Sequence, residues 1–109
     1  MSLHKIQHAT PVSATATHAT SAVATVSGIA GSTMYITDIA GSSDKAGSLL
    51  LVKQGTTTIW QIQLATTAAG MNAFWQKFES PLIAAAGADI SVTVDGTSAC
   101  KANIAGFYI

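Results

Sequence analysis

The chain has 109 residues, of which 49% are hydrophobic and only 9% are charged, and its five lysines balance its five acidic residues. It contains no arginine, and the lysines are spread along the whole chain, so it lacks the clustered positive charge that binding to nucleic-acid phosphates requires. No run approaches the roughly 18 apolar residues of a membrane-spanning helix, and the first eight residues lack the apolar core of a signal peptide. We therefore expect one domain that binds neither nucleic acid nor membrane and that acts inside a cell or on a particle assembled there.

Residues 1–27 are predicted to form an extended N-terminal arm and a first strand, ahead of a β-sandwich domain at residues 28–109. Pro11 biases Thr10 toward an extended backbone. From residue 12 to residue 26, small apolar side chains alternate with serine and threonine, and the frequent threonine favours strand over helix despite the many alanines. This alternation places on one side Val12, Ala14, Ala16, Ala22, Ala24 and Val26.

Residues 33–39 are predicted to form the next strand, which ends at the glycine- and serine-rich turn cluster of residues 41–47. Residues 49–53 follow as a continuous apolar run, which favours a strand covered on both faces. Residues 54–56 are typical of a hairpin turn.

The strand predicted at residues 57–64 places Trp60, Ile62 and Leu64 toward the core, and a loop is expected at residues 65–70. A further strand at residues 72–78 carries three aromatic side chains. Phe74 and Phe78 share one parity, while Trp75 falls on the other, so Trp75 is a candidate for the surface or for an interface.

Pro81 is expected to interrupt strand pairing, which leaves residues 80–87 as a connection with room for one helical turn. Residues 89–95 and 100–109 are predicted to form the last two strands, and Ile90, Val92 and Val94 share one face of the first of them. Seven or eight short strands without credible helices predict an all-β fold, a single-domain antiparallel β-sandwich that is jelly-roll-like with an extended N-terminal arm.

Candidate chemistry is sparse in this sequence. His4 and His8 have the i, i+4 spacing of a helical metal site, but the arm is short and no neighbouring acid or cysteine completes a ligand set. His18 with one of the scattered acids could form a small hydrolase site, although no Gly-x-Ser-x-Gly elbow is present. The single Cys100 is interpreted as a buried hydrophobe. We expect no catalytic residue, no metal and no cofactor, so the chain is not predicted to be an enzyme.

The order of several segments resembles a group of small jelly-roll-like proteins of bacteriophage virions. The resemblance covers about three quarters of the chain and is carried by turn glycines and core positions rather than by reactive groups. Its segments are residues 30–38, 49–55, 59–60, 68–70, 78–83, 86–90 and 105–109. No motif of the group matches the N-terminal third.

The resemblance implies a non-enzymatic structural protein that decorates or cements the outer surface of a capsid, often as a homotrimer. The implied partners are the major capsid protein and further copies of this chain, on a virion assembled in the host cytoplasm. An alternative is a receptor- or carbohydrate-binding β-sandwich module of a virion fibre or tail, with Trp75 as its contact. The residues that we expect at an interface are Leu3, Ile6, Val12, Trp75, Phe107 and Ile109.

Overall fold

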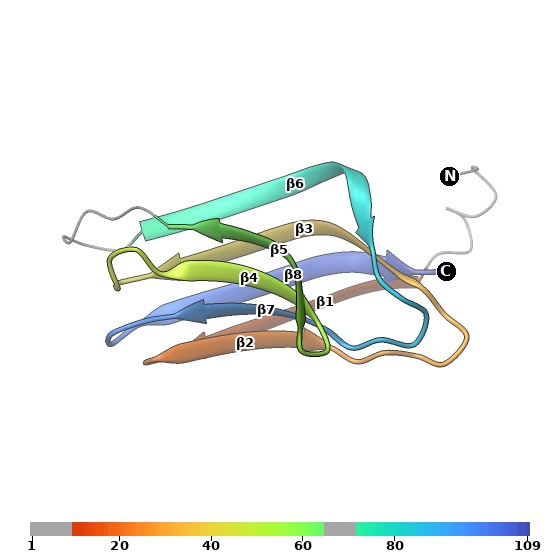
Figure 1. Cartoon of the computed structure of the whole chain (residues 1–109), viewed down its shortest axis with the longest axis horizontal. Helices are drawn as coiled ribbons and strands as arrows, with labels where there is room; N and C mark the ends of the chain where they lie inside the picture. The colour runs from red at the N-terminus through yellow and green to blue at the C-terminus, as the bar shows by residue number, and fades with distance from the viewer. Residues whose placement is uncertain (1–9, 65–71) are drawn as a thin grey trace.

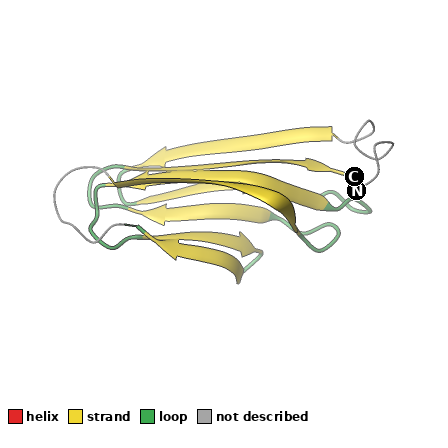
Figure 2. Cartoon of the chain, turned by 90° about the horizontal axis from the view of Figure 1, so that it is seen from above, coloured by secondary structure: helices red, strands yellow, loops and turns green. Residues whose placement is uncertain are grey.

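The computed structural model describes residues 10–64 and 72–109, which form eight strands and no helix (Figure 1). Figure 2 shows that the strands run roughly along the long axis of the molecule and stack in two layers. In chain order the strands are β1 (Thr10–His18), β2 (Ser21–Val26), β3 (Met34–Ser43), β4 (Leu49–Gln54), β5 (Thr57–Gln63), β6 (Asn72–Ile83), β7 (Ile90–Asp95) and β8 (Cys100–Tyr108).

The two layers are four-stranded antiparallel sheets. Sheet A has the strand order β1-β8-β3-β6, and sheet B has the order β2-β7-β4-β5. The predicted all-β antiparallel sandwich is confirmed. Residues 10–26, which we assigned to the arm and the first strand, supply one edge strand to each sheet, because the chain crosses from sheet A to sheet B between β1 and β2.

The core lies between the sheets and is built from alternate residues of both. Ile90, Val92 and Val94 of β7 are fully buried, as the alternation predicts. On β5, Trp60 and Ile62 pack against the core, and Leu64 after it is buried. The other buried apolar residues are Ala22, Ala24, Val26, Met34, Ile36, Ile39, Leu50, Val52, Ala84, Cys100, Ala102, Ile104 and Tyr108.

β3 continues further than the sequence predicts, because the turn expected at residues 41–47 begins only after Ser43. Gly41 is buried on the inner side of this strand. A Cβ at Gly41 would lie 2.7 Å from Cδ1 of Leu50 and 2.8 Å from Cγ2 of Val94. Glycine is therefore required here for the close approach of the two sheets and does not mark a turn.

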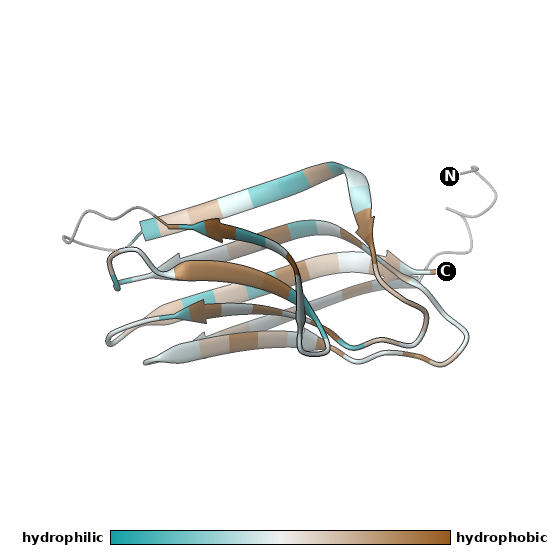
Figure 3. Cartoon of the chain, in the orientation of Figure 1, coloured by the Kyte–Doolittle hydropathy of each residue, from teal (hydrophilic) through white to brown (hydrophobic). Residues whose placement is uncertain are grey.

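β4 is covered on one face only, so the prediction of a strand covered on both faces is wrong. Leu50 and Val52 are fully buried, whereas Leu49 is 44% exposed on the opposite face. Figure 3 shows that β4 is hydrophobic along most of its length, although among the described residues no third layer covers sheet B. The two-residue turn at Gly55 and Thr56, with a positive φ of 59° at Gly55, confirms the predicted hairpin.

β6 passes through Pro81 and ends at Ile83, so the connection predicted at residues 80–87 starts only after Ile83 and contains a turn but no helical turn. Pairing with β3 stops at Lys77 and resumes at Leu82. Pro81 lies in the unpaired stretch between them, where its missing N–H costs no ladder hydrogen bond. The prediction that pairing is interrupted holds only locally, and the strand bends sharply there (Figure 1).

Two serine hydroxyls share one acceptor at one end of the sandwich. Ser43 at the end of β3 and Ser48 before β4 are both buried. Both hydroxyls donate to the carbonyl oxygen of Asp95 at the end of β7, with a distance of 2.6 Å for Ser48. The Ser43 oxygen also accepts the backbone N–H of Lys45 at 3.0 Å. These bonds satisfy buried polar groups, and the bond from Ser43 in β3 to Asp95 in β7 ties sheet A to sheet B.

The turn after β3 is also tied to the loop between β7 and β8. The Asp44 carboxylate accepts the backbone N–H groups of Thr97 at 2.8 Å and Ser98 at 2.9 Å, together with the Ser98 hydroxyl. These bonds, first the one from the Ser98 hydroxyl and then the one from the Thr97 N–H, lower the pKa of Asp44 to about 2. The Asp44 carboxylate therefore links the turn after β3 to the loop between β7 and β8.

Candidate functional site

The candidate site is the outer surface of sheet A, which we call the sheet-A face. Because side chains alternate along a strand, residues paired across the sheet fall into rows on this face. In the strand order β1, β8, β3, β6, these rows are Pro11–Phe107–Tyr35–Ile83, Ser13–Ala105–Asp38–Lys77, Thr15–Asn103–Ala40–Trp75 and Thr17–Lys101–Ser42–Ala73.

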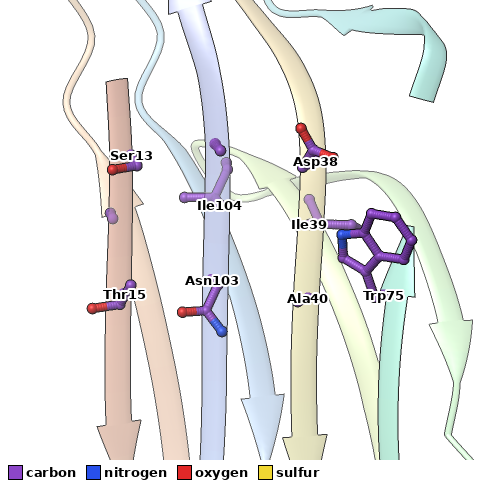
Figure 4. A pocket seen from close by; sticks show the side chains of 10 residues that line it. Ser13, Thr15, Asp38, Ile39, Ala40, Trp75, Asn103 and Ile104 are labelled. Carbon is purple, nitrogen blue, oxygen red and sulfur yellow. The ribbon is translucent and has the colours of Figure 1, made fainter. Parts of the chain in front are cut away.

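Trp75 is 65% exposed on the sheet-A face. Its neighbours Phe74 and Phe78 point the other way and pack on Trp60, with ring centroids 6.1 Å and 5.5 Å from that indole. The parity of β6 thus separates an inner aromatic cluster from one outer indole, as the sequence predicts. Figure 4 shows the Trp75 ring nearly face-on beside β3, and the exposed fraction of its side chain leaves much of the indole accessible to a partner.

A shallow hollow of about 220 Å³ lies beside this indole. It exists because Ala40 of β3 and Ala105 of β8 have small side chains between larger neighbours. The Asp38 carboxylate, the Asn103 amide and the Ser13 and Thr15 hydroxyl groups line it as well (Figure 4). A second hollow of about 420 Å³ lies next to Trp75 and is lined by Ser42, Ala73 and Lys101 among others.

A second apolar group lies on the row that contains Phe107. The rings of Tyr35 and Phe107 are stacked with centroids 5.2 Å apart and planes 9° from parallel. Ile83, paired with Tyr35 across β3 and β6, is 64% exposed. The sheet-A face thus carries exposed apolar side chains in two of its rows, with Asp38 and Lys77 paired in the row between them.

A β-bulge positions Asp38 on this face. Ile36 pairs with Gly106 and Asp38 pairs with Ala105, which leaves Thr37 as the extra residue. The Thr37 hydroxyl lies 2.9 Å from the Asp38 carboxylate and can donate to it. The bulge therefore fixes the direction of the one acidic side chain in the hollow.

The expected interface residues occupy different parts of the molecule. Trp75 and Phe107 lie on the sheet-A face, in separate rows. Val12 packs against the core on the other side of β1. Ile109 follows β8 and exchanges two backbone hydrogen bonds with Thr33, at 2.9 Å and 3.0 Å. Leu3 and Ile6 lie outside the described residues, as do His4 and His8.

His18 and Cys100 have structural surroundings. The Nδ1 atom of His18 accepts the backbone N–H groups of Thr20 and Ser21, each at 3.1 Å, and so closes the turn between β1 and β2. Cys100 is fully buried, which confirms its interpretation as a buried hydrophobe, and its thiol can donate to the His18 carbonyl at 3.3 Å. Within residues 10–64 and 72–109, histidine, cysteine and acidic side chains form no group of three that could hold a metal, and no helix could cross a membrane.

The polar residues that line the hollow were not predicted from the sequence. Asp38, Asn103 and Thr15 are far apart along the chain and meet only because β1, β8 and β3 are neighbours in sheet A. No local motif marks them, since each has the ordinary outward parity of its strand. The exposure of Ile83 was also missed, because the predicted strand ended before it.

Comparisons with known proteins assign this chain to no family. The sequence matches no family model, and no curated protein matches it. Among solved structures it is similar to a chain of the extra small virus (XSV) virus-like particle of the giant freshwater prawn Macrobrachium rosenbergii, with 11% sequence identity and a TM-score of 0.40. The match covers 92% of this chain and 79% of that one.

Proposed function

We propose that this chain is a non-enzymatic structural protein of a bacteriophage virion, a decoration or cement protein that binds the outer surface of the capsid. Its partner would be the major capsid protein, and assembly would take place in the host cytoplasm. The observation that carries the proposal is the sheet-A face, where Trp75 and Ile83 are 65% and 64% exposed. Large apolar side chains that are exposed on one face, here the two most exposed ones among the described residues, supply contact area for a partner.

The physical demands on a cement protein fit this face. Such a protein stabilises a shell by burying area across the joints between subunits, at about 800 Å² per partner in a typical interface. Tryptophan and tyrosine commonly contribute most of the binding energy in such contacts, and Trp75 and Tyr35 lie in different rows of the face. The low charge content, 9% of residues, keeps repulsion between neighbouring copies small.

The strand pairing supports the jelly-roll part of the prediction. β1 pairs with β8, β2 with β7, β3 with β6 and β4 with β5, so the chain runs as a ribbon of four antiparallel pairs folded into two sheets. Eight strands in two such sheets are the arrangement of jelly-roll domains, which are common in viral capsids and in lectins. The fold is therefore suited to a virion role without requiring one.

The test is binding to capsids. Particles of the major capsid protein encoded in the same genome, prepared without this chain, are mixed with the wild-type protein and with two variants. Trp75→Ala should reduce the bound fraction at least tenfold, whereas the matched variant Leu49→Ala, on the outer face of sheet B, should bind as the wild type does. Absence of binding by the wild-type protein would contradict the proposal.

A carbohydrate-binding module is the second candidate, favoured by the exposed indole of Trp75 beside Asp38 and Asn103. An aromatic platform with nearby amide, carboxylate and hydroxyl groups can stack on a sugar ring and bind its hydroxyls. A glycan array separates the candidates: specific signals that Trp75→Ala abolishes would favour this module, and a blank array would exclude it.

The homotrimer implied by the resemblance stays a prediction.

A further inference from the structure

The edge strand β1 has an unusually regular free side. It pairs with β8 over nine consecutive residues, from Thr10 opposite Tyr108 to His18 opposite Cys100, without a register shift. On its other side no described strand continues sheet A. Alternate backbone N–H and C=O groups of β1 therefore point away from the sheet and can pair with another strand.

The other three edge strands carry features that discourage such pairing. β6 has a break in register around Pro81 and charged side chains at Lys77 and Glu79. β5 has seven residues and pairs with β4 through a bulge beside Lys53, and β2 has only six residues. Short length, bulges, proline and charge are the devices by which proteins protect sheet edges, and β1 carries only Pro11, at its second residue.

β1 and β2 also contain no lysine and no acidic residue. No lysine or acidic residue occurs between Lys5 and Asp38. β2 lies beside β1, although in the other sheet (Figure 1). Two copies that pair through β1 therefore place no lysine or acidic residue of this strand opposite another, whereas pairing through β6 would also have to accommodate the charged Lys77 and Glu79 of both copies.

We propose that β1 pairs antiparallel with β1 of a second copy of this chain, so that the two A sheets form one continuous eight-stranded sheet. An antiparallel pair of identical strands has two-fold symmetry, so a single contact satisfies the free edges of both copies. The backbone hydrogen bonds supply the association, as in other cases of strand addition. This inference goes beyond the proposed function and is independent of it, because the purified chain alone tests it.

The expected contact is small. Nine residues at about 3.4 Å each give a strand of about 30 Å. A single strand pair of this length buries less than the roughly 800 Å² per partner of a stable complex, even with some contribution from β2. We therefore expect a dimer of twice 11.1 kDa that dissociates on dilution.

The test is sedimentation velocity over about a hundredfold dilution series. Thr15→Lys/Thr17→Lys places two charges on exposed positions of β1, and Thr56→Lys/Thr58→Lys makes the same change, with the same spacing, at exposed positions of the β4–β5 hairpin on the opposite edge. The wild type and the hairpin variant should dimerise alike, while the β1 variant should dissociate at least tenfold more readily. Thermal melts of all three proteins check that each is folded.

Three outcomes would overturn the inference. They are a wild-type monomer at every concentration, a trimer or dimer that the β1 substitutions leave unchanged, and equal weakening by both double variants. Hydrogen exchange gives a second readout that does not depend on a variant. The free amides of β1 should exchange more slowly in concentrated than in dilute wild-type protein, and unchanged exchange would also contradict the proposal.

Discussion

The inner and outer faces of sheet A follow the same two-residue alternation but differ in what they contribute. On the inner face Ile36, Ile39 and Ile104 are at most 2% exposed, whereas on the outer face Trp75 and Ile83 are 65% and 64% exposed. Apolar side chains on the inner face stabilise the fold, because they are removed from water on folding. Those on the outer face gain little from folding and are free to bind a partner. Substitutions on the two faces should therefore separate stability from binding.

The largest effect is expected at Ile104. It is 2% exposed, so Ile104→Ala removes buried methyl groups and leaves a cavity between the sheets, at a cost of about 3 kcal/mol in the free energy of unfolding. Urea denaturation measures this loss. The neighbouring Asn103→Ala, on the outer face, is the matched control and should cost less than about 0.5 kcal/mol. Equal losses of unfolding free energy in the two variants would contradict the proposed difference between the inner and outer faces.

A smaller effect is expected where the two sheets are joined by Ser43. Ser43→Ala removes one of two hydroxyl donors to the Asp95 carbonyl and should lower the free energy of unfolding by about 1 kcal/mol. Ser48→Ala should act similarly. Because both hydroxyls share one acceptor, the double variant should lose more than the sum of the two single losses. Denaturation of the four proteins gives this coupling, and strict additivity would contradict it.

The contribution of Asp44 to stability should be smaller than that of Ser43, and it should change only at acidic pH. Its pKa is lowered from 3.8 to about 2 on folding, so the folded state favours the carboxylate, and stability rises with pH across this interval. The contribution of Asp44 is complete above about pH 4 and is lost as the pH falls toward 2. Melting temperatures of the wild type and Asp44→Asn should differ above pH 4 and converge below it. Ser98→Ala, which removes the hydroxyl donor, should reduce this difference, and a pH-independent difference would contradict the assignment.

The smallest effect on stability is expected at Trp75. Since the side chain is 65% exposed, Trp75→Ala should change the free energy of unfolding by less than about 0.5 kcal/mol. The same variant should weaken capsid binding strongly under the proposed function. A large loss of stability, measured by urea denaturation, would place Trp75 with the core and remove the basis for a binding face.

The elements that were predicted correctly depend on local parity. Ile90, Val92 and Val94 alternate with polar residues, so one face of β7 could be assigned to the core from the sequence alone. The continuation of β6 through Pro81 could not, because it depends on pairing with β3 beyond the bulge at Thr37. The same limit applies to the candidate site. The parity of Phe74 and Phe78 marked Trp75 as outward, but the hollow needs Ala40 and Asn103 beside it, and that neighbourhood follows from the strand order rather than from any segment.

The pairing of Thr10 with Tyr108 brings the two ends of the sandwich-forming chain together on neighbouring strands. A short linker could therefore join them, and new ends could be opened at the exposed hairpin of Gly55 and Thr56 without cutting a strand. Such a circular permutant would keep every strand pair of both sheets while moving its termini to the β5 edge. It would leave the β1 edge without a nearby chain end, so bulky tags or fused cargo could be carried without obstructing that edge.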